Sequence, residues 1–456
     1  MRHPILPFAM ACALAIPAFA ADVASTRVGP VSQYGQLMTG KNSQGMGRIY
    51  GSCEGVKDGA EVQVRGMSLY WSLMPQAMEF WSEEGVTTMV NDMNIQIVRA
   101  AMATKASDDW SGEWNGIKLK GWEGDQTNQT QFMKTVVEAA IKNDIYVIID
   151  WHSHSAHQQT SSAKKFFEEM AREYGQYDNV IFELFNEPED ISWSEIKSYA
   201  DQVVQVIRQY SDNLVLVGTP KWDQNPHLAI GNEVNDSKKN TAYTLHYYAN
   251  SHCWSGNTSW GEACEGEKGL QAMKAGLSVF VSEWGTADAN GGGNPDQSKN
   301  SGWQNYINDN KLSWANWSAS KINEGTAAFT NSATKTSLQY TTSGNLVKGY
   351  LSTNPKSYTA CPTKNPNGSS TTAVPLHRGA ESFKVSFANG KLAFESKVTG
   401  MTKIEVFDLL GHAYFQKTEA FASGSHQIDL GNLPSGNYLA RVRQGTNIQQ
   451  TRFQVR

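Results

Sequence analysis

Two segments of the sequence each place a glutamate at or just after the end of a run of β-forming residues. Glu187 follows the strand-like run 180–185 after one residue, Asn186, and precedes Pro188, and Glu283 ends the run 279–283. If both runs are parallel strands of one closed barrel, their carboxyl ends open into the same mouth and the two carboxylates meet there. Such a pair can cleave a glycosidic bond, because one group protonates the leaving oxygen while the other attacks or activates water. Either glutamate alone could instead be solvated or cap the next helix.

Alternating strands and helices are needed to position this pair. Between residues 61 and 351, short β-rich runs alternate with longer amphipathic runs, as in repeated βα units. Several β-rich runs are apolar on both faces, which is typical of strands between a barrel interior and outer helices. We therefore predict an α/β fold, a (β/α)8 TIM barrel. Its eight predicted strands are 62–66, 95–100, 145–151, 180–185, 214–218, 242–246, 279–283 and 312–317.

Two helices are clearly marked between these strands. Apolar residues recur at helical spacing over 128–142, and a second amphipathic run covers 193–210. Ser192 precedes the second run and Glu195 stands three positions later, so we predict a capping box at its start.

The chain divides into four predicted regions. Residues 1–20 have a weakly positive start, an apolar stretch and a small-residue cleavage site, as in a signal peptide. Residues 21–361 contain the barrel. Residues 362–380 are rich in Pro, Asn, Gly, Ser and Thr and are predicted to be a linker. Residues 381–456 alternate β-rich runs with turns, which predicts a small all-β, sandwich-like module.

The composition excludes some classes of partner. The net charge of −5 and pI near 6.1 provide no basic surface for nucleic acid or for an anionic membrane. After the leader, no apolar run reaches the roughly 20 residues that a membrane span needs. We expect the protein to be a monomer. We also expect it to need no cofactor, because proton transfer and covalent trapping need only side chains.

The cysteines predict disulfide bridges in an exported protein. Removal of Cys12 with the leader leaves Cys53, Cys253, Cys264 and Cys361, an even set. Four cysteines allow three pairings, one of which closes a short loop (253 to 264) and ties the start of the barrel region to its end (53 to 361). Free buried thiols are the alternative, and metal binding is disfavoured because no CxxC pair occurs.

Seven short motifs fall at the predicted strand ends and together suggest a family. They are Val64-Arg65-Gly66-Met67, Ile97-Val98-Arg99, Asp150-Trp151-His152, Asn186-Glu187-Pro188, His246-Tyr247-Tyr248, Ser282-Glu283-Trp284-Gly285 and Asn316-Trp317-Ser318. In this order they resemble the family 5 glycoside hydrolases, in particular bacterial endoglucanases. The resemblance implies a secreted, retaining endo-β-1,4-glucanase whose partner is a β-1,4-glucan such as cellulose.

The resemblance also implies roles for individual residues. Glu187 matches the acid/base and Glu283 the nucleophile, with carboxyl groups about 5 Å apart. Asn186 matches a residue that binds the sugar 2-hydroxyl. Arg99 and Tyr248 match groups that keep the nucleophile ionised.

Further matched positions concern sugar binding. His152 and His246 match sugar-binding and acid/base-orienting positions, Trp317 matches a stacking platform, and we add Trp71 from the first loop. Without the motifs, Arg99 could be an interior ion-pair residue, His246 a core histidine and Trp317 a packing residue.

A group of histidines and the first loop also lie near these motifs. His152, His154 and His157 with Asp150 resemble a metal cluster, but the resemblance assigns His152 to substrate, so we predict no metal. The first loop lacks a histidine often found in the family. Five more tryptophans fall where loops are predicted and could line a groove for successive sugars; they are Trp110, Trp114, Trp122, Trp254 and Trp260.

The C-terminal module resembles the type A sorting domains of the type IX secretion route, through the segments 406–411 and 433–438. This implies contact with secretion machinery or attachment at the cell surface. A carbohydrate-binding module is the rival, but it needs exposed aromatics on one face. Most of the aromatics fall instead at core-like alternating positions; they are Phe383, Phe387, Phe394, Phe407, Tyr414 and Tyr438.

Two alternatives to a cellulase remain. The same barrel and carboxylate pair serve mannanases, xyloglucanases and mixed-linkage glucanases, because loop shape selects the sugar. A non-catalytic glycan-binding surface protein would keep the groove without the chemistry, but both carboxylates are present.

Overall fold

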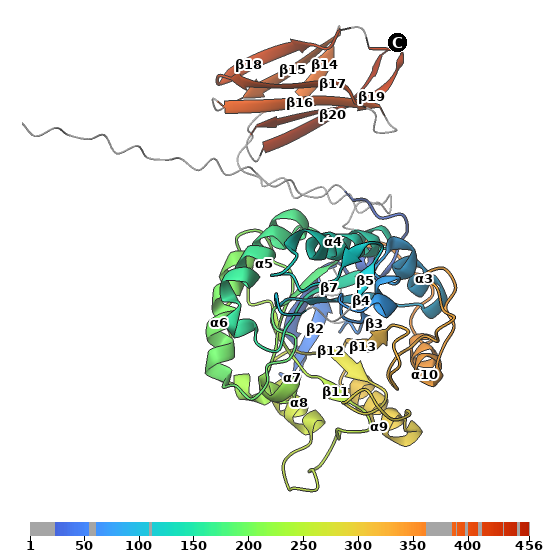
Figure 1. Cartoon of the computed structure of the whole chain (residues 1–456). Coiled ribbons are helices and arrows are strands. Elements are labelled where there is room, and N and C mark those ends of the chain that lie inside the picture. The colour runs from blue at the N-terminus through green and yellow to red at the C-terminus, as the bar shows by residue number, and fades with distance from the viewer. Residues whose placement is uncertain are drawn as a thin grey trace, which may run out of the picture. The chain divides into compact units, whose positions relative to one another are not determined.

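The computed structural model describes residues 23–53, 61–108, 112–361, 385–388, 390–396, 400–408, 413–431, 433–444 and 447–455. They form two compact units, an α/β barrel unit that ends at residue 361 and an all-β unit that begins at residue 385 (Figure 1). The predicted signal peptide and linker lie outside the described residues.

The barrel unit contains eight parallel strands in a closed ring, which confirms the predicted fold. The ring follows the order β10-β9-β8-β7-β4-β3-β13-β12, and pairing of β10 with β12 closes it. The strands are β3 (Arg65–Leu69), β4 (Ile97–Ala103), β7 (Tyr146–His152), β8 (Val180–Glu183), β9 (Val215–Val217), β10 (Thr241–Thr244), β12 (Val279–Gly285) and β13 (Trp314–Ala319), with β11 (Tyr247–Tyr248) also paired to β12.

The first strand was predicted at 62–66, but β3 covers Arg65–Leu69. Residues before it pair elsewhere: Val62 donates its N–H to Ile49, and Glu61 forms a bridge with Tyr50. These hydrogen bonds go to the N-terminal hairpin instead of the neighbouring barrel strands, so the barrel pairing starts later.

Helices surround the barrel (Figure 1). The amphipathic runs predicted at 128–142 and 193–210 form helices at Gln126–Lys142 and Trp193–Ile207, and the capping box of Ser192 and Glu195 is present. The α-helices are α1 (Pro30–Tyr34), α2 (Pro75–Met78), α3 (Glu83–Met93), α4 (Gln126–Lys142), α5 (Thr160–Tyr174), α6 (Trp193–Ile207), α7 (Pro220–Asp223), α8 (Glu265–Lys274), α9 (Gln297–Asp309) and α10 (Thr342–Leu351). Short elements are η1 (Ala156–Gln158), η2 (Pro226–Ala229), β5 (Glu113–Trp114) and β6 (Ile117–Lys118).

The barrel interior has an apolar layer below a charged layer. Side chains alternate along a strand, so Ile97 and Arg99 share a face of β4, and Ile181 and Glu183 share a face of β8. The lower layer is closed by the antiparallel hairpin of β1 (Leu37–Lys41) and β2 (Gly47–Gly51). One buried cluster joins hairpin and strands; it includes Leu37, Ile49, Val64, Ile97, Ile148, Ile181, Leu216 and Phe280.

The two predicted disulfides are present. One joins Cys53 to Cys361 across a sequence separation of 308, and the other joins Cys253 to Cys264. The first ties the start of the barrel unit to its end.

The all-β unit consists of two sheets that share one core. One sheet has the order β14 (Val385–Ala388), β15 (Lys391–Ser396), β18 (Gly424–Asp429), and the other has β17 (Ala413–Phe421), β16 (Gly400–Asp408), β19 (Gly436–Gln444), β20 (Asn447–Val455). Their buried side chains form a single cluster, as in a sandwich. Of the aromatics predicted to be core-like, Phe394 and Tyr438 are buried, but Tyr414 is 46% exposed and only its ring edge contacts Tyr438. Phe383 lies outside the described residues.

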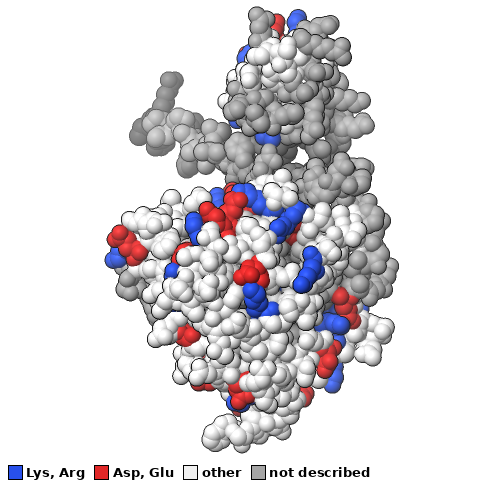
Figure 2. All heavy atoms as spheres, turned by 90° about the vertical axis from the view of Figure 1, so that its right-hand side faces the viewer, with Lys and Arg blue, Asp and Glu red and all other residues white. Residues whose placement is uncertain are grey.

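The surface of the barrel unit carries both acidic and basic side chains. Figure 2 shows acidic and basic side chains interspersed on the face that carries α3 and α10, where Lys348 pairs with Asp92 and Lys335 with Glu84. Within the described part of the chain, no helix is long and apolar enough to cross a membrane.

Candidate active site

The predicted site residues lie together at the carboxyl ends of the barrel strands. Arg99 lies on β4, His152 on β7, Glu283 on β12 and Trp317 on β13. The other members lie in or next to elements at the same end: Trp71 follows β3, Asn186 and Glu187 follow β8, His246 stands between β10 and β11, and Tyr248 is in β11. This is the end at which barrel enzymes carry their active sites.

Arg99 is the centre of a buried charge network. Its side chain is fully buried, and its guanidinium donates to Glu183 Oε2 at 2.6 Å, Glu283 Oε2 at 2.7 Å and Asn186 Oδ1 at 2.6 Å. A further ion pair joins Nη2 to Asp150 Oδ2 at 3.0 Å. A buried charge must be paired, and here one cation faces three acidic side chains. The network fixes Glu283 and Asn186 in the mouth.

Glu283 accepts a hydrogen bond at each carboxylate oxygen. Arg99 donates to Oε2, and the hydroxyl of Tyr248 donates to Oε1 at 2.7 Å. Burial and repulsion from Glu187 raise the pKa of Glu283 above its ordinary value, while Arg99 and the Tyr248 hydroxyl oppose the rise. Because a guanidinium can only donate, this arrangement suits an ionised Glu283.

Glu187 is the more accessible of the two glutamates, with a side chain that is 14% exposed against 4% for Glu283. His246 Nδ1 lies 3.0 Å from Glu187 Oε1. Burial would raise the pKa of Glu187, but the hydrogen bond and charge of His246 lower it below its ordinary value. This direction is opposite to the one that a general acid needs, so the proton on His246 matters for any role of Glu187 as an acid.

His246 is surrounded by acceptors. Its Nε2 lies 2.9 Å from Ser282 Oγ and 3.3 Å from Asp223 Oδ2, while Nδ1 faces Glu187. Burial would lower the pKa of His246, but the neighbouring carboxylates of Asp223, Glu183 and Glu187 raise it well above its ordinary value. The raised pKa favours the doubly protonated imidazole, whose Nδ1–H can donate to Glu187.

Aromatic side chains form one wall of the mouth. The rings of Trp317 and His152 are parallel with centroids 5.4 Å apart, and the ring of Tyr70 is tilted against Trp317 with centroids 4.7 Å apart. Trp71 contacts His152 edge-on at 5.1 Å. Burial and nearby Arg99 lower the pKa of His152, so its ring is neutral. Its Nδ1 lies 2.7 Å from Asp150 Oδ2, a contact that favours the tautomer with the proton on Nδ1, in which Nε2 can accept from a sugar hydroxyl.

The five further tryptophans differ in their surroundings. Trp122 is buried against Trp151 with centroids 5.4 Å apart, so it belongs to the core and cannot line a groove. Trp254 packs edge-on against Trp303. Trp260 is 91% exposed. Trp114 is half-buried in β5, and Trp110 lies outside the described residues.

Sequence reasoning missed several residues that support this site. Glu183 shares the interior face of β8 with Ile181, and the alternation along the strand, together with the need of Arg99 for partners, would have identified it. Ser282 stood in one of the seven motifs but was given no role, and Asp223 and Tyr70 have no comparable signal. Trp222, which is 44% exposed and follows β9, was not singled out either.

The acidic and imidazole groups could in principle hold a metal. Among the described residues, one donor atom each from Glu187, His246 and Glu283 lies within 4.8 Å of the others. Each of these side chains is already bonded within the network: both nitrogens of His246 face acidic or hydroxyl groups, and Glu283 faces Arg99. This donor set is poorly suited to a cation. In the histidine cluster considered above, His157 lies beside Phe185 while His152 faces Asp150.

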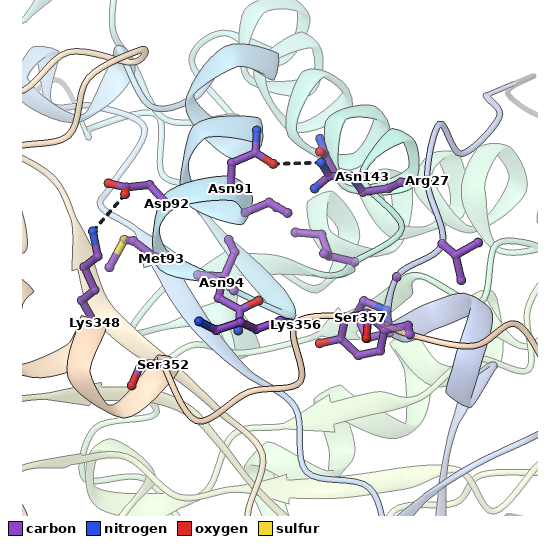
Figure 3. Close-up of a pocket in the computed structure, with 17 residues that line it drawn as sticks. Arg27, Asn91, Asp92, Met93, Asn94, Asn143, Lys348, Ser352, Lys356 and Ser357 are labelled. Atoms are coloured by element: carbon purple, nitrogen blue, oxygen red, sulfur yellow. Dashed lines mark hydrogen bonds and ion pairs between the residues drawn. The ribbon is translucent and has the colours of Figure 1, made fainter.

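A cavity of about 660 Å³ lies at the opposite end of the barrel, and Figure 3 shows its lining. Ile95 and Ile145, which precede β4 and β7, contribute to it together with Asn94 and Tyr358. It shares no residue with the site at the carboxyl ends.

Comparisons with known proteins fit this geometry. The profile of the family described as Cellulase (glycosyl hydrolase family 5) matches residues 56–323. Endoglucanase Z of Dickeya dadantii is 41% identical over 267 residues, 58% of this chain and 57% of the relative. An endoglucanase of Clostridium saccharobutylicum is 32% identical over 330 residues, 69% of this chain and 67% of the relative. The chain thus spans little more than half the length of Endoglucanase Z.

The chain is also similar to a solved structure, and its C-terminal part matches a second family profile. The catalytic domain of Thermobifida fusca endoglucanase Cel5A superposes with a TM-score of 0.57 at 26% identity, covering 71% of this chain and all of that domain (100%). The profile of the secretion system C-terminal sorting domain matches residues 386–456. The prediction that the all-β unit is a sorting domain is confirmed.

Proposed function

Because the chain belongs to glycosyl hydrolase family 5, we propose that it is an exported, retaining endo-β-1,4-glucanase that cleaves internal bonds of cellulose or related β-glucans. Glu187 is the acid/base and Glu283 the nucleophile. The polysaccharide is the partner, and no cofactor takes part. The endoglucanases among its relatives support the activity.

The observation that carries the proposal is the separation of the two carboxylates. An oxygen of Glu187 and an oxygen of Glu283 lie within 4.8 Å of each other. Inverting enzymes place a water between carboxyl groups about 6.5–9.5 Å apart, whereas retaining enzymes need only about 5–5.5 Å for direct attack. The close approach of these two oxygens, together with membership of family 5, supports a double displacement.

In the first step, Glu283 attacks the anomeric carbon while Glu187 gives its proton to the leaving oxygen. One C–O bond forms to the enzyme as the glycosidic C–O bond breaks. In the second step, Glu187 takes a proton from water, which attacks the anomeric carbon and releases the sugar from Glu283. Arg99 and Tyr248 favour the ionised Glu283 before attack, and Asn186, bonded to Arg99 at 2.6 Å, can bind the sugar 2-hydroxyl.

The proton for the first step comes from the pair of Glu187 and His246. The raised pKa of His246 and the lowered pKa of Glu187 favour the proton on the imidazole, whose Nδ1 lies 3.0 Å from Glu187 Oε1. Moving it along this hydrogen bond produces a neutral imidazole and a protonated Glu187 without a further charge in the site. A bound sugar excludes water and disfavours separated charges, so it favours this transfer.

Sugar binding at the cleavage point rests on the aromatic wall. Trp317 offers a ring face beside His152, and Trp71 lies edge-on to the same histidine. Indole faces suit the apolar faces of pyranose rings, while Nε2 of His152 accepts from a hydroxyl.

The C-terminal sorting domain supports export, with contact to secretion machinery or attachment at the cell surface. The predicted signal peptide at 1–20 belongs to the same proposal, as does a monomeric state.

Product analysis tests the activity. The enzyme should release reducing ends from carboxymethyl cellulose with a rapid fall in viscosity, and cellotetraose should first yield products in the β configuration by NMR. An α product would refute the retaining mechanism. A panel with mannan, xyloglucan and mixed-linkage glucan separates the alternatives, and saturable binding without chain shortening would indicate a non-catalytic binder.

A further inference from the structure

A disulfide-closed hairpin stands between β11 and α8. The Cys253–Cys264 disulfide closes it, Thr258 N donates to Glu262 O at 2.7 Å, and Gly261 N donates to Thr258 O at 2.9 Å. Gly261 has a φ of 85°, which a residue with a side chain rarely adopts, so the turn requires glycine there. The loop therefore has one defined shape, and it projects beside α8 (Figure 1).

The base of this hairpin is anchored to two helices. The ring of Trp254 packs against Trp303 of α9, with centroids 6.4 Å apart. Cys253 N donates to Glu265 Oε2 at 3.0 Å, and Gly256 N donates to Glu267 Oε1 at 3.1 Å, both in α8. These contacts hold the loop against the barrel unit.

The tip of the hairpin displays Trp260 to solvent. This side chain is 91% exposed, far more than any other exposed large apolar side chain in the described residues. Within that part of the chain it makes no ring contact, although Trp254 of the same loop does. An indole in water on a rigid support loses little conformational freedom when a ligand stacks on it.

The base of the hairpin is linked by a chain of contacts to the Glu187 side of the mouth. His252, at its base, contacts Gln224 at 3.3 Å. Gln224 follows Asp223, whose carboxylate faces the same His246 that bonds Glu187. In the proposed reaction, the leaving part of the polymer extends from the Glu187 side.

We infer that Trp260 is an outlying stacking site for the β-glucan polymer, on the leaving-group side of the cleavage point. The inference rests on the proposed function and extends it to the polymer beyond the mouth. The tip suits a neutral ligand, because residues 257–261 are Asn, Thr, Ser, Trp and Gly, and the first charge after them is Glu262. Sugar rings offer apolar faces to an indole and hydroxyls to the neighbouring amide and hydroxyl groups.

The test compares polymer and short substrates in the full chain with Trp260→Ala. One indole face buries roughly 60 Å² of apolar surface, so we expect binding to insoluble cellulose to weaken about tenfold. The rate of hydrolysis of insoluble cellulose should fall as well. The fold-loss in this rate should be at least five times the fold-change in kcat/KM on cellotetraose. A Cys253→Ser/Cys264→Ser double variant keeps the indole but loosens its support, and should show a smaller loss in the same direction. Leu228→Ala removes an exposed apolar side chain from η2 and should change neither quantity.

The outcomes separate this inference from the proposed function. If the wild type cleaves cellotetraose but Trp260→Ala binds and degrades insoluble cellulose as the wild type does, the inference is wrong and the activity stands. If Trp260→Ala instead changes the oligomeric state on gel filtration with cellulose binding intact, the tip is a contact between copies and the inference is overturned. If the wild type cleaves no β-1,4-glucan, the proposed function fails and the inference fails with it.

Discussion

The two ends of the barrel are built from the same strands but differ in where they place charge. At the carboxyl ends, Arg99, Asp150, Glu183 and Glu283 are buried and paired with one another. At the amino ends, the polar groups that line the cavity of about 660 Å³ are paired locally: Asn94, for example, exchanges hydrogen bonds with Asn354, and the side-chain amide of each residue donates to the backbone carbonyl of the other. Its charged side chains lie near the surface, as the pair of Lys348 and Asp92 does.

This difference shows what each end contributes. Apolar residues such as Ile97 and Ile181 fill the lower barrel layer and stabilise the fold by burial. The upper layer exchanges apolar packing for buried charges, which rarely add stability over apolar packing and shift pKa values strongly. We therefore expect substitutions in the buried charge network at the carboxyl ends to impair activity, and substitutions of charged side chains at the amino ends to leave activity unchanged and stability little changed.

The largest effect should come from Glu283→Ala. Without the nucleophile, kcat on carboxymethyl cellulose should fall at least about a thousandfold, because no covalent intermediate forms. Sodium azide should restore turnover of an aryl β-cellobioside by occupying the vacated space, with an α-glycosyl azide as product. The matched control is Glu61→Ala at the amino end, where Glu61 pairs with Arg48 at 3.3 Å, and its kcat should stay within twofold of the wild type. Retention of most activity in Glu283→Ala would refute the nucleophile assignment.

Arg99→Met should have the next largest effect, on stability as well as activity. It leaves Asp150, Glu183 and Glu283 buried without their shared cation, and breaking a buried pair on one side costs about 3–5 kcal/mol. Urea unfolding measures this loss. Arg65→Met tests the other end of the barrel, because Arg65 donates to the hydroxyl of Thr353, and should cost less than about 1 kcal/mol. Equal losses in the two variants would contradict the contrast between the ends.

The strand-end arrangement of the site could be predicted from sequence, but much of its support could not. Glu187 and Glu283 each follow a recognisable strand, so their meeting in one mouth follows from the barrel. Asp223 reaches His246 from the loop after β9, where Lys221, Trp222 and Asp223 all have positive φ, and no local pattern predicts such a turn. The contrast between buried Trp122 and exposed Trp260 is equally invisible in sequence, because it depends on which distant side chains pack around each ring.

Tyr248→Phe should change the pH dependence of activity. The Tyr248 hydroxyl donates to Glu283 and lowers the pKa of that carboxyl, so its removal raises the pKa. Because attack requires an ionised Glu283, the acidic limb of the kcat/KM profile should move to higher pH. Tyr70→Phe is the control, because the Tyr70 hydroxyl bonds Glu324 at 2.8 Å, and its acidic limb should coincide with that of the wild type. An acidic limb that does not move in Tyr248→Phe would show that the Tyr248 hydroxyl does not control the pKa of Glu283.

The smallest effect should come from Lys348→Met at the amino end. Lys348 and Asp92 lie 2.9 Å apart, but their side chains are 36% and 44% exposed, and Tyr340 also donates to Asp92. Exposed pairs contribute about 0–1 kcal/mol, because water and salt screen them. A double-mutant cycle of Lys348→Met with Asp92→Asn should therefore give a coupling below about 1 kcal/mol that shrinks in high salt, with kcat/KM on cellotetraose unchanged. A larger, salt-insensitive coupling, or a loss of activity, would mean that the cavity end acts on the mouth, and the division of roles between the two ends would fail.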